Sequence, residues 1–162
     1  HSLEIQLPFF PRVLEPGWQL VPILLATMQN ADYLEAAEAL RPLLDEETLL
    51  VVSTDFTHYG AAFRYLPFPA DMRIAKRLRE LDTGAFRYLT AKDPEGFLNY
   101  RNDTGITICG YRAVALLLHL LPSESAVQLL QYTTSGGLTG NYSHSVSYIA
   151  AMVTAAAQPK DN

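Results

Sequence analysis

The sequence predicts an α/β fold: a single-domain core in which a mixed, largely parallel sheet is flanked by helices. The first observation is the order of its segments, because apolar, strand-like runs alternate with amphipathic, helix-forming segments. The second is residues 48–53, a continuous apolar run of the kind that forms a parallel strand buried on both faces. The third is the length of 162 residues, which suits one domain that buries about 70% of its unfolded surface.

The N-terminal half is predicted to alternate helix and strand. Compact apolar runs predict the strands, and Pro22 moves the first of them to an edge or a bulge. Helical spacing or Ala/Leu/Glu-rich composition predicts the helices, and prolines shorten or kink the first. In order, we expect a short helix near residues 3–10, a strand at 18–25, a helix from Asn30 or Asp32 to about Leu44, and a strand at 48–53.

The C-terminal half is predicted to be helical first and then to form strands. Amphipathic spacing predicts a helix at residues 69–81, and Asp93 followed by Pro94 is typical of an N-cap and first turn. Residues 111–121 are an almost wholly apolar helix that ends before Pro122. Residues 127–133 and 146–153 predict strands by their β-branched and aromatic content, with a Gly-rich turn at 135–140 between them.

Composition excludes several classes of protein. The chain has 12 basic and 17 acidic residues, a formal net charge of −5, so a nucleic-acid partner is not expected. The longest apolar run, residues 113–118, is too short to span a bilayer, and we expect no membrane association. Cys109 is the single cysteine and cannot form an intramolecular disulfide, which favours a reducing, cytoplasmic location.

The strongest candidate site follows the apolar run at residues 48–53. Asp55 and His58 come three residues apart after a predicted strand, where loops hold functional groups on a rigid scaffold. Asp55 could orient the His58 imidazole and leave its other nitrogen as an acid/base or a ligand. The alternative is structural: Asp55 caps the following turn and His58 fills a polar niche.

Cys109 is the second candidate, because it lies just before or at the start of the apolar helix. The partial positive charge at a helix start favours the thiolate, which could bind a soft or borderline metal or act as a nucleophile. The alternative is a small buried hydrophobic residue beside Ile108.

The remaining histidines are weaker candidates. His1 is either a terminal copper-binding group or an internal residue of a truncated chain. His119, among leucines, is expected to be a core or helix-surface histidine, and His144 a loop histidine that is solvated or lines a cleft. The sequence has no Gly-rich phosphate loop and no Gly-x-Ser-x-Gly elbow, so nucleotide binding and serine hydrolysis lose their main support.

Four motifs together resemble the Memo family, also called the AmmeMemoRadiSam system protein B family. Both their letters and their order match, and they extend over nearly the whole chain. They are HSLEIQLP at residues 1–8, STDFTHYG at 53–60, TICG at 107–110 and SVSY at 145–148.

The resemblance implies a fold similar to class III extradiol dioxygenases of the LigB type, with a cleft at the strand ends. In those enzymes two histidines and a carboxylate hold Fe(II), and another histidine assists as acid/base. The Memo-family cleft has a cysteine in place of the carboxylate, which matches Cys109 as a metal ligand. Asp55, His58 and His1 would lie in the same cleft, as ligand-orienting, proton-moving or catalytic residues. The implied cofactor is iron or copper.

The resemblance also implies that part of the domain precedes residue 1. Two further histidine ligands would lie there, together with strands of the sheet. We therefore interpret residues 1–154 as the C-terminal portion of one Memo-like α/β domain and residues 155–162 as a frayed tail. Such a portion is expected to have an incomplete sheet with exposed apolar edges.

The leading functional hypothesis is a Memo-like, metal-binding, redox-related protein with a dioxygenase-like cleft and an unknown substrate. One alternative is a non-haem-iron dioxygenase-type oxidoreductase in which His58 is the acid/base. The other is a peptide- or partner-binding scaffold without catalysis. The family resemblance also implies a radical-SAM protein and an AMMECR-type protein as partners.

Overall fold

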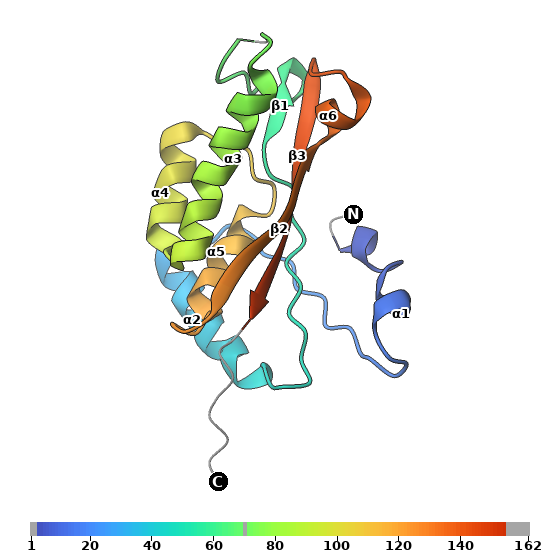
Figure 1. Cartoon of the computed structure of the whole chain (residues 1–162). Coiled ribbons are helices and arrows are strands. Elements are labelled where there is room, and N and C mark those ends of the chain that lie inside the picture. The colour runs from blue at the N-terminus through green and yellow to red at the C-terminus, as the bar shows by residue number, and fades with distance from the viewer. Residues whose placement is uncertain (1–2, 70, 155–162) are drawn as a thin grey trace.

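The computed structural model describes residues 3–69 and 71–154. Helices α2 to α5 lie on one side of a small sheet, and the N-terminal segment with α1 lies on the other side (Figure 1). The helices are α1 (Phe10–Val13), α2 (Asn30–Leu40), α3 (Ile74–Ala91), α4 (Pro94–Thr104), α5 (Tyr111–Leu120) and α6 (Ser135–Thr139), with 3-10 turns η1 (Glu4–Gln6), η2 (Arg41–Leu43) and η3 (Ala61–Phe63).

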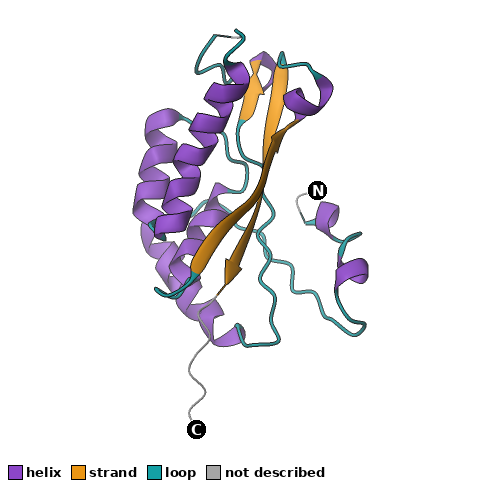
Figure 2. Cartoon of the chain, in the orientation of Figure 1, coloured by secondary structure: helices purple, strands orange, loops and turns teal. Residues whose placement is uncertain are grey.

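The sheet of the described residues has three strands in the order β1-β3-β2 (Figure 2). The strands are β1 (His58–Gly60), β2 (Ala126–Thr134) and β3 (His144–Thr154). Both pairs are antiparallel, with a β-bulge in β2 between Leu129 and Gln131. The central strand β3 thus joins the long β2 to the short β1, from which the candidate site begins.

The α/β class is confirmed, but the largely parallel sheet is not found among the described residues. Residues 18–25 and 48–53, both predicted to be strands, run as loops that pair with no described strand. An apolar run indicates that a segment is buried, but a strand also needs a neighbouring backbone that satisfies its N–H and C=O groups. Neither segment finds such a backbone among the described residues.

The helix predicted at residues 69–81 begins later and ends later. It begins at Ile74, after the Asp71 side chain accepts a hydrogen bond from the Arg73 N–H at 2.8 Å. It continues through Gly84 to Ala91. A side chain at Gly84 would collide with Tyr100 of α4, so glycine is needed where the two helices pack. Glycine here permits close helix packing and does not break the helix.

The remaining C-terminal elements are confirmed with small changes. Asp93 caps α4 by accepting a hydrogen bond from the Gly96 N–H at 2.8 Å. The strands predicted at residues 127–133 and 146–153 are β2 and β3, and α5 matches the predicted apolar helix. The Gly-rich turn between the strands contains the short helix α6, capped by the Thr134 side chain.

The core lies between the helical layer and the sheet. Its fully or almost fully buried side chains come from α2, α3, α4, α5 and the loops before β1 and α5, and include Tyr33, Phe56, Ala85, Phe97, Ile106, Val114 and Leu118. A second cluster of Tyr59, Ile74 and Leu78 joins β1 to α3. The strand that carries His58 is therefore fixed to the helical layer.

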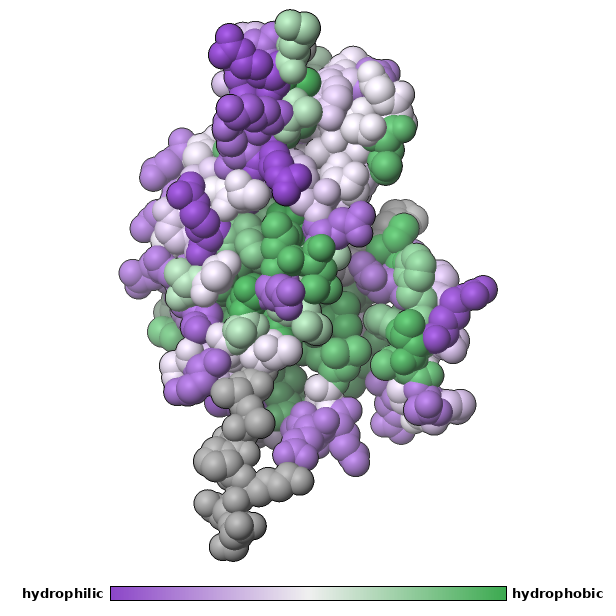
Figure 3. Space-filling view, in the orientation of Figure 1, coloured by the Kyte–Doolittle hydropathy of each residue, from purple (hydrophilic) through white to green (hydrophobic). Residues whose placement is uncertain are grey.

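The loops at residues 18–25 and 48–53 leave large apolar side chains exposed. Apolar residues gather in the middle of the face shown in Figure 3 and on the N-terminal segment. The exposed side chains of the two loops are Trp18, Leu20, Val21, Ile23, Leu24, Leu49, Leu50 and Val51. Exposed apolar side chains in this number mark a surface that normally contacts something else. Among the described residues, no helix combines the length and apolar character needed to cross a membrane.

Candidate functional site

The candidate site begins on the segment that leads into β1. The Phe56 N–H donates to the Ser147 carbonyl, and the Ser147 N–H donates to the Thr57 carbonyl, both at 2.9 Å. These bonds continue the pairing with β3 beyond the strand itself. Phe56 and Thr57 are buried, while the flanking Asp55 and His58 are partly exposed. Asp55 and His58 therefore flank a buried pair of residues, and each stays partly accessible at one end of that pair.

Cys109 reaches the same place from the loop between α4 and α5. The Asp55 N–H donates to its Sγ at 3.1 Å, and the Cys109 N–H donates to the Asp55 carbonyl at 3.3 Å. The Thr54 Oγ1 lies 3.7 Å from the same sulfur. Cys109 is exposed although Ile108 is buried, so the interpretation of Cys109 as a small buried hydrophobic residue is wrong.

Gly110 allows these two segments to approach each other. Its N–H donates to the Thr54 Oγ1 at 2.8 Å. A Cβ at this position would lie 2.6 Å from the Thr54 Cβ, a separation that packed Cβ atoms essentially never show, and 3.0 Å from the Ser53 carbonyl oxygen, which is also tight. The glycine after Cys109 is therefore required by the close approach of the two backbones.

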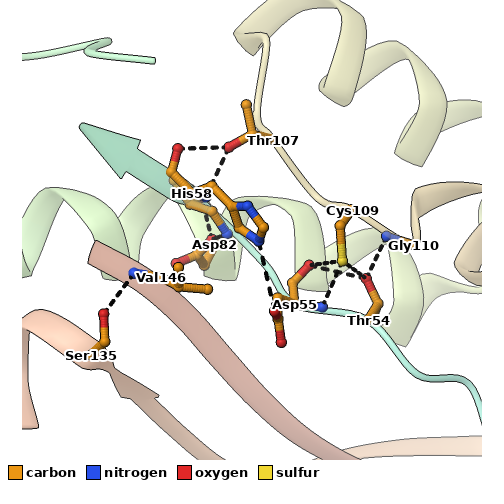
Figure 4. Close-up of polar contacts among 10 residues, drawn as sticks. Thr54, Asp55, His58, Asp82, Thr107, Cys109, Gly110, Ser135 and Val146 are labelled. Atoms are coloured by element: carbon orange, nitrogen blue, oxygen red, sulfur yellow. Dashed lines mark hydrogen bonds and ion pairs between the residues drawn. The ribbon is translucent and has the colours of Figure 1, made fainter. Parts of the chain in front are cut away.

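Together these contacts bring three metal-binding side chains to one point. One ligand atom from each of Asp55, His58 and Cys109 lies within 4.8 Å of the other two (Figure 4). The His58 Nε2 is 3.8 Å from an Asp55 carboxylate oxygen, within ion-pair range but beyond hydrogen-bond distance. That nitrogen is buried and has no hydrogen-bond partner among the described residues. The cluster therefore presents thiol, imidazole and carboxylate groups, with one imidazole nitrogen free.

The backbone of His58 is held by Thr107, two residues before Cys109. The His58 N–H donates to the Thr107 Oγ1 at 2.8 Å, and that hydroxyl donates to the His58 carbonyl at 2.9 Å. The Phe63 ring lies against the imidazole, with centroids 5.1 Å apart. The sequence motif at residues 107–110 thus contributes a support for His58 as well as the thiol.

An apolar cavity of about 290 Å³ adjoins the cluster at Cys109. It lies between α5 and the loops at residues 23–25 and 50–53. Most of its lining is aliphatic, and Arg112 and Ser53 add polar groups. Its side chains include Ile23, Leu50, Val52, Ala113 and Leu116.

The structure does not bring His119 or His144 into the cluster. His1 lies outside the described residues. His119 stacks on Tyr33 with ring centroids 5.9 Å apart, and burial lowers its pKa. His144 is exposed at the start of β3, with its Nδ1 3.2 Å from the Ser143 hydroxyl. His119 and His144 are therefore separate from the candidate site, as expected of a packing and a loop histidine.

Sequence reasoning missed Asp82, a buried carboxyl on α3 beneath the site. Its side chain accepts two hydrogen bonds from Thr57, the residue between Asp55 and His58. The signal was available: Asp82 lies on the stripe of buried residues along α3 at positions 74, 78, 82, 85 and 89. The predicted helix ended one residue before it.

Comparisons with known proteins agree with the motif resemblance. The family model of Memo-like proteins matches residues 1–152. A MEMO1 family protein of Methanopyrus kandleri is 31% identical over 155 residues, which cover 93% of this chain and 50% of that protein. The human protein MEMO1 is 27% identical over 165 residues, covering 95% of this chain and 56% of its own length. The chain spans about half the length of the curated relatives it matches.

The approach of Gly110 to Thr54 makes a testable prediction. Gly110→Ala should lower the free energy of unfolding by about 1–3 kcal/mol, because the new methyl group cannot fit against Thr54. Thr54→Gly removes the colliding atoms, so the loss caused by Gly110→Ala should shrink in that background. Denaturant unfolding of the two single variants and the double variant measures this coupling. An equal loss in both backgrounds contradicts the proposed contact.

Proposed function

The chain belongs to the Memo-like protein family, and on that premise we propose that it is a metal-binding, redox-related protein whose centre is the cluster of Asp55, His58 and Cys109. The observation that carries the proposal is the convergence of three different donor groups within 4.8 Å. Asp55 and His58 come from the segment that leads into and begins β1, and Cys109 from a loop 54 residues after Asp55, and hydrogen bonds between Asp55 and Cys109 join the two segments. A convergent cluster of this kind, one member of which lines a cavity, is a candidate metal site on physical grounds.

The donor set fits iron or copper. A thiolate binds soft or borderline metals, an imidazole suits copper, iron and zinc, and a carboxylate adds a hard donor. The His58 Nε2 is buried without a hydrogen-bond partner among the described residues, a state that a bound ion would relieve. We propose Cys109 as the principal ligand, because its thiolate distinguishes the set from the histidine–carboxylate sites of Fe(II) oxygenases.

Asp55 prepares both other members of the cluster to bind an ion. The Asp55 N–H donates to the Cys109 sulfur, and such a donor stabilises the thiolate that a metal requires. The Asp55 carboxylate faces the imidazole and favours its orientation toward the ion. Iron or copper, when bound, supplies one-electron redox chemistry.

A second candidate is an oxidoreductase of the non-haem-iron dioxygenase type. It is favoured by the same free nitrogen of His58, which could move a proton beside the Asp55 carboxylate. His1, outside the described residues, would assist in that reading. Turnover of a catechol by the iron-loaded protein under oxygen distinguishes this enzyme from a protein that only binds metal.

We also propose that the natural protein carries further strands against the loops at residues 18–25 and 48–53. Their large apolar side chains are exposed, and exposed apolar surface of this extent is unfavourable in a protein that stands alone. The curated relatives are about twice as long as the part that this chain matches. The two additional histidine ligands implied by the family resemblance would lie in that sequence. The radical-SAM and AMMECR-type partners and the cytoplasmic location also stay predictions.

Metal content tests the proposed centre directly. The natural protein, purified without added metal, should hold near-stoichiometric iron or copper by elemental mass spectrometry. Cys109→Ala should abolish binding, and His58→Ala should weaken it at least about tenfold. His144→Ala is the matched control, because this exposed histidine lies outside the cluster, and it should bind metal as the wild type does.

Three results separate the readings. Metal retained at wild-type affinity in His58→Ala would assign His58 to proton transfer and not to the ion. Metal retained in Cys109→Ala contradicts the ligand assignment. No metal in any variant, even after reconstitution, refutes the metal proposal and favours a scaffold whose apolar cavity binds a peptide or partner.

The proposal of further strands predicts the mass of the natural protein. Intact-mass analysis should give a value well above the 18.0 kDa of the 162 residues. A natural chain of 18.0 kDa that begins at His1 contradicts the proposal.

A further inference from the structure

Asp82 is a buried carboxyl that hydrogen bonds join to three elements of the fold. It is fully buried on α3. Its Oδ1 accepts from the Thr57 N–H at 3.1 Å and from the Thr57 hydroxyl at 2.6 Å. Its Oδ2 accepts from the Tyr132 hydroxyl of β2 at 2.8 Å, and the Ser147 hydroxyl of β3 adds a further hydrogen bond. One side chain thus links α3, both long strands and the segment that carries the candidate site.

A buried carboxyl at this position of α3 is less favourable for stability than an apolar residue would be, so helix packing alone does not explain why Asp82 is there. Burial raises the pKa of Asp82, and the hydrogen bonds from Ser147, Thr57 and Tyr132 oppose that shift. Within the described part of the chain, no ion pair neutralises Asp82; the nearby Arg79 stacks on the Tyr132 ring, 5.2 Å from its centroid. An apolar residue would suit this buried stripe of α3 better.

The partner of Asp82 with the closest link to the site is Thr57. Thr57 is fully buried and lies between Asp55 and His58 in the chain. Its N–H and hydroxyl both donate to Asp82, and its carbonyl accepts from the Ser147 N–H. All of its polar groups are therefore fixed, and two of its three hydrogen bonds depend on Asp82. In Figure 4, Asp82 lies behind His58, on the other side of this segment from Cys109.

We propose that Asp82 is a positioning residue for the proposed metal centre. By fixing Thr57 it determines where Asp55 and His58 project relative to Cys109. Groups that orient ligands from behind them change metal affinity by about 10- to 100-fold when they are removed. The inference rests on the proposed function for its metal readout, but the position of His58 can be measured without metal.

Two matched pairs of variants test this role. Thr57→Val removes the hydroxyl that donates to Asp82 and keeps the shape of the side chain, whereas Thr57→Ser keeps the hydroxyl. Asp82→Leu removes both acceptor oxygens and leaves the Thr57 N–H and hydroxyl without their acceptor, while Tyr132→Phe removes a hydrogen bond to the same carboxyl without touching Thr57. Tyr132→Phe is therefore the control that shows how a loss of stability alone affects the His58 signals and Fe²⁺ affinity.

Two readouts are needed, both at temperatures where thermal unfolding shows each variant to be folded. The first is the ring ¹⁵N and ¹H NMR signals of His58 in the metal-free protein at one fixed pH. The second is Fe²⁺ affinity, measured anaerobically by competition with a chelator. Asp82→Leu and Thr57→Val should shift the His58 signals and weaken Fe²⁺ binding about tenfold. Thr57→Ser and Tyr132→Phe should resemble the wild type in both.

The outcomes are distinguishable. If Asp82→Leu and Thr57→Val lose stability but keep the His58 signals and Fe²⁺ affinity of the wild type, Asp82 is structural only and the inference is wrong. If the wild type binds no Fe²⁺, the proposed function fails, and the His58 signals alone decide whether Asp82 positions the ring. If Asp82→Leu does not fold, the comparison of Thr57→Val with Thr57→Ser decides.

Discussion

The contact between the segment that leads into β1 and the loop before α5 is the constraint on which the site depends. Three hydrogen bonds join Asp55 to Cys109, two that involve the sulfur and one between backbone groups. Gly110 and Thr107 extend the same contact on either side. Because these segments lie about fifty residues apart in the chain, the donor cluster exists only when the core beneath it has folded.

In the segment that leads into β1, some residues stabilise the fold and others form the candidate site. Buried residues of the segment, Phe56 and Thr57, anchor it to the core and to Asp82, while the residues on either side face outward. Ligands held on an anchored strand lose less conformational freedom when an ion binds than ligands on a mobile loop would lose. The buried carboxyl of Asp82 is unfavourable as a packing group, but its hydrogen bonds to Thr57 explain its presence, because they anchor this segment.

The sequence predicts part of this picture for clear physical reasons. Local signals predict α4, where Asp93 and Pro94 form a standard helix start, and the convergence of Asp55, His58 and Cys109 is expected from the motif resemblance. The strands expected at residues 18–25 and 48–53 are not formed, because pairing depends on a neighbour that local sequence does not specify. Asp82 was missed because its role comes from contacts with residues 25 and 50 positions away.

X-ray absorption at the metal edge tests the central claim most directly, since the claim is that Cys109 binds the ion. The wild-type protein should show a metal–sulfur scattering shell together with nitrogen or oxygen donors. Cys109→Ser, which replaces only the sulfur, should lose the sulfur shell. A spectrum without sulfur scattering in the metal-loaded wild type, or one unchanged in Cys109→Ser, would contradict the account.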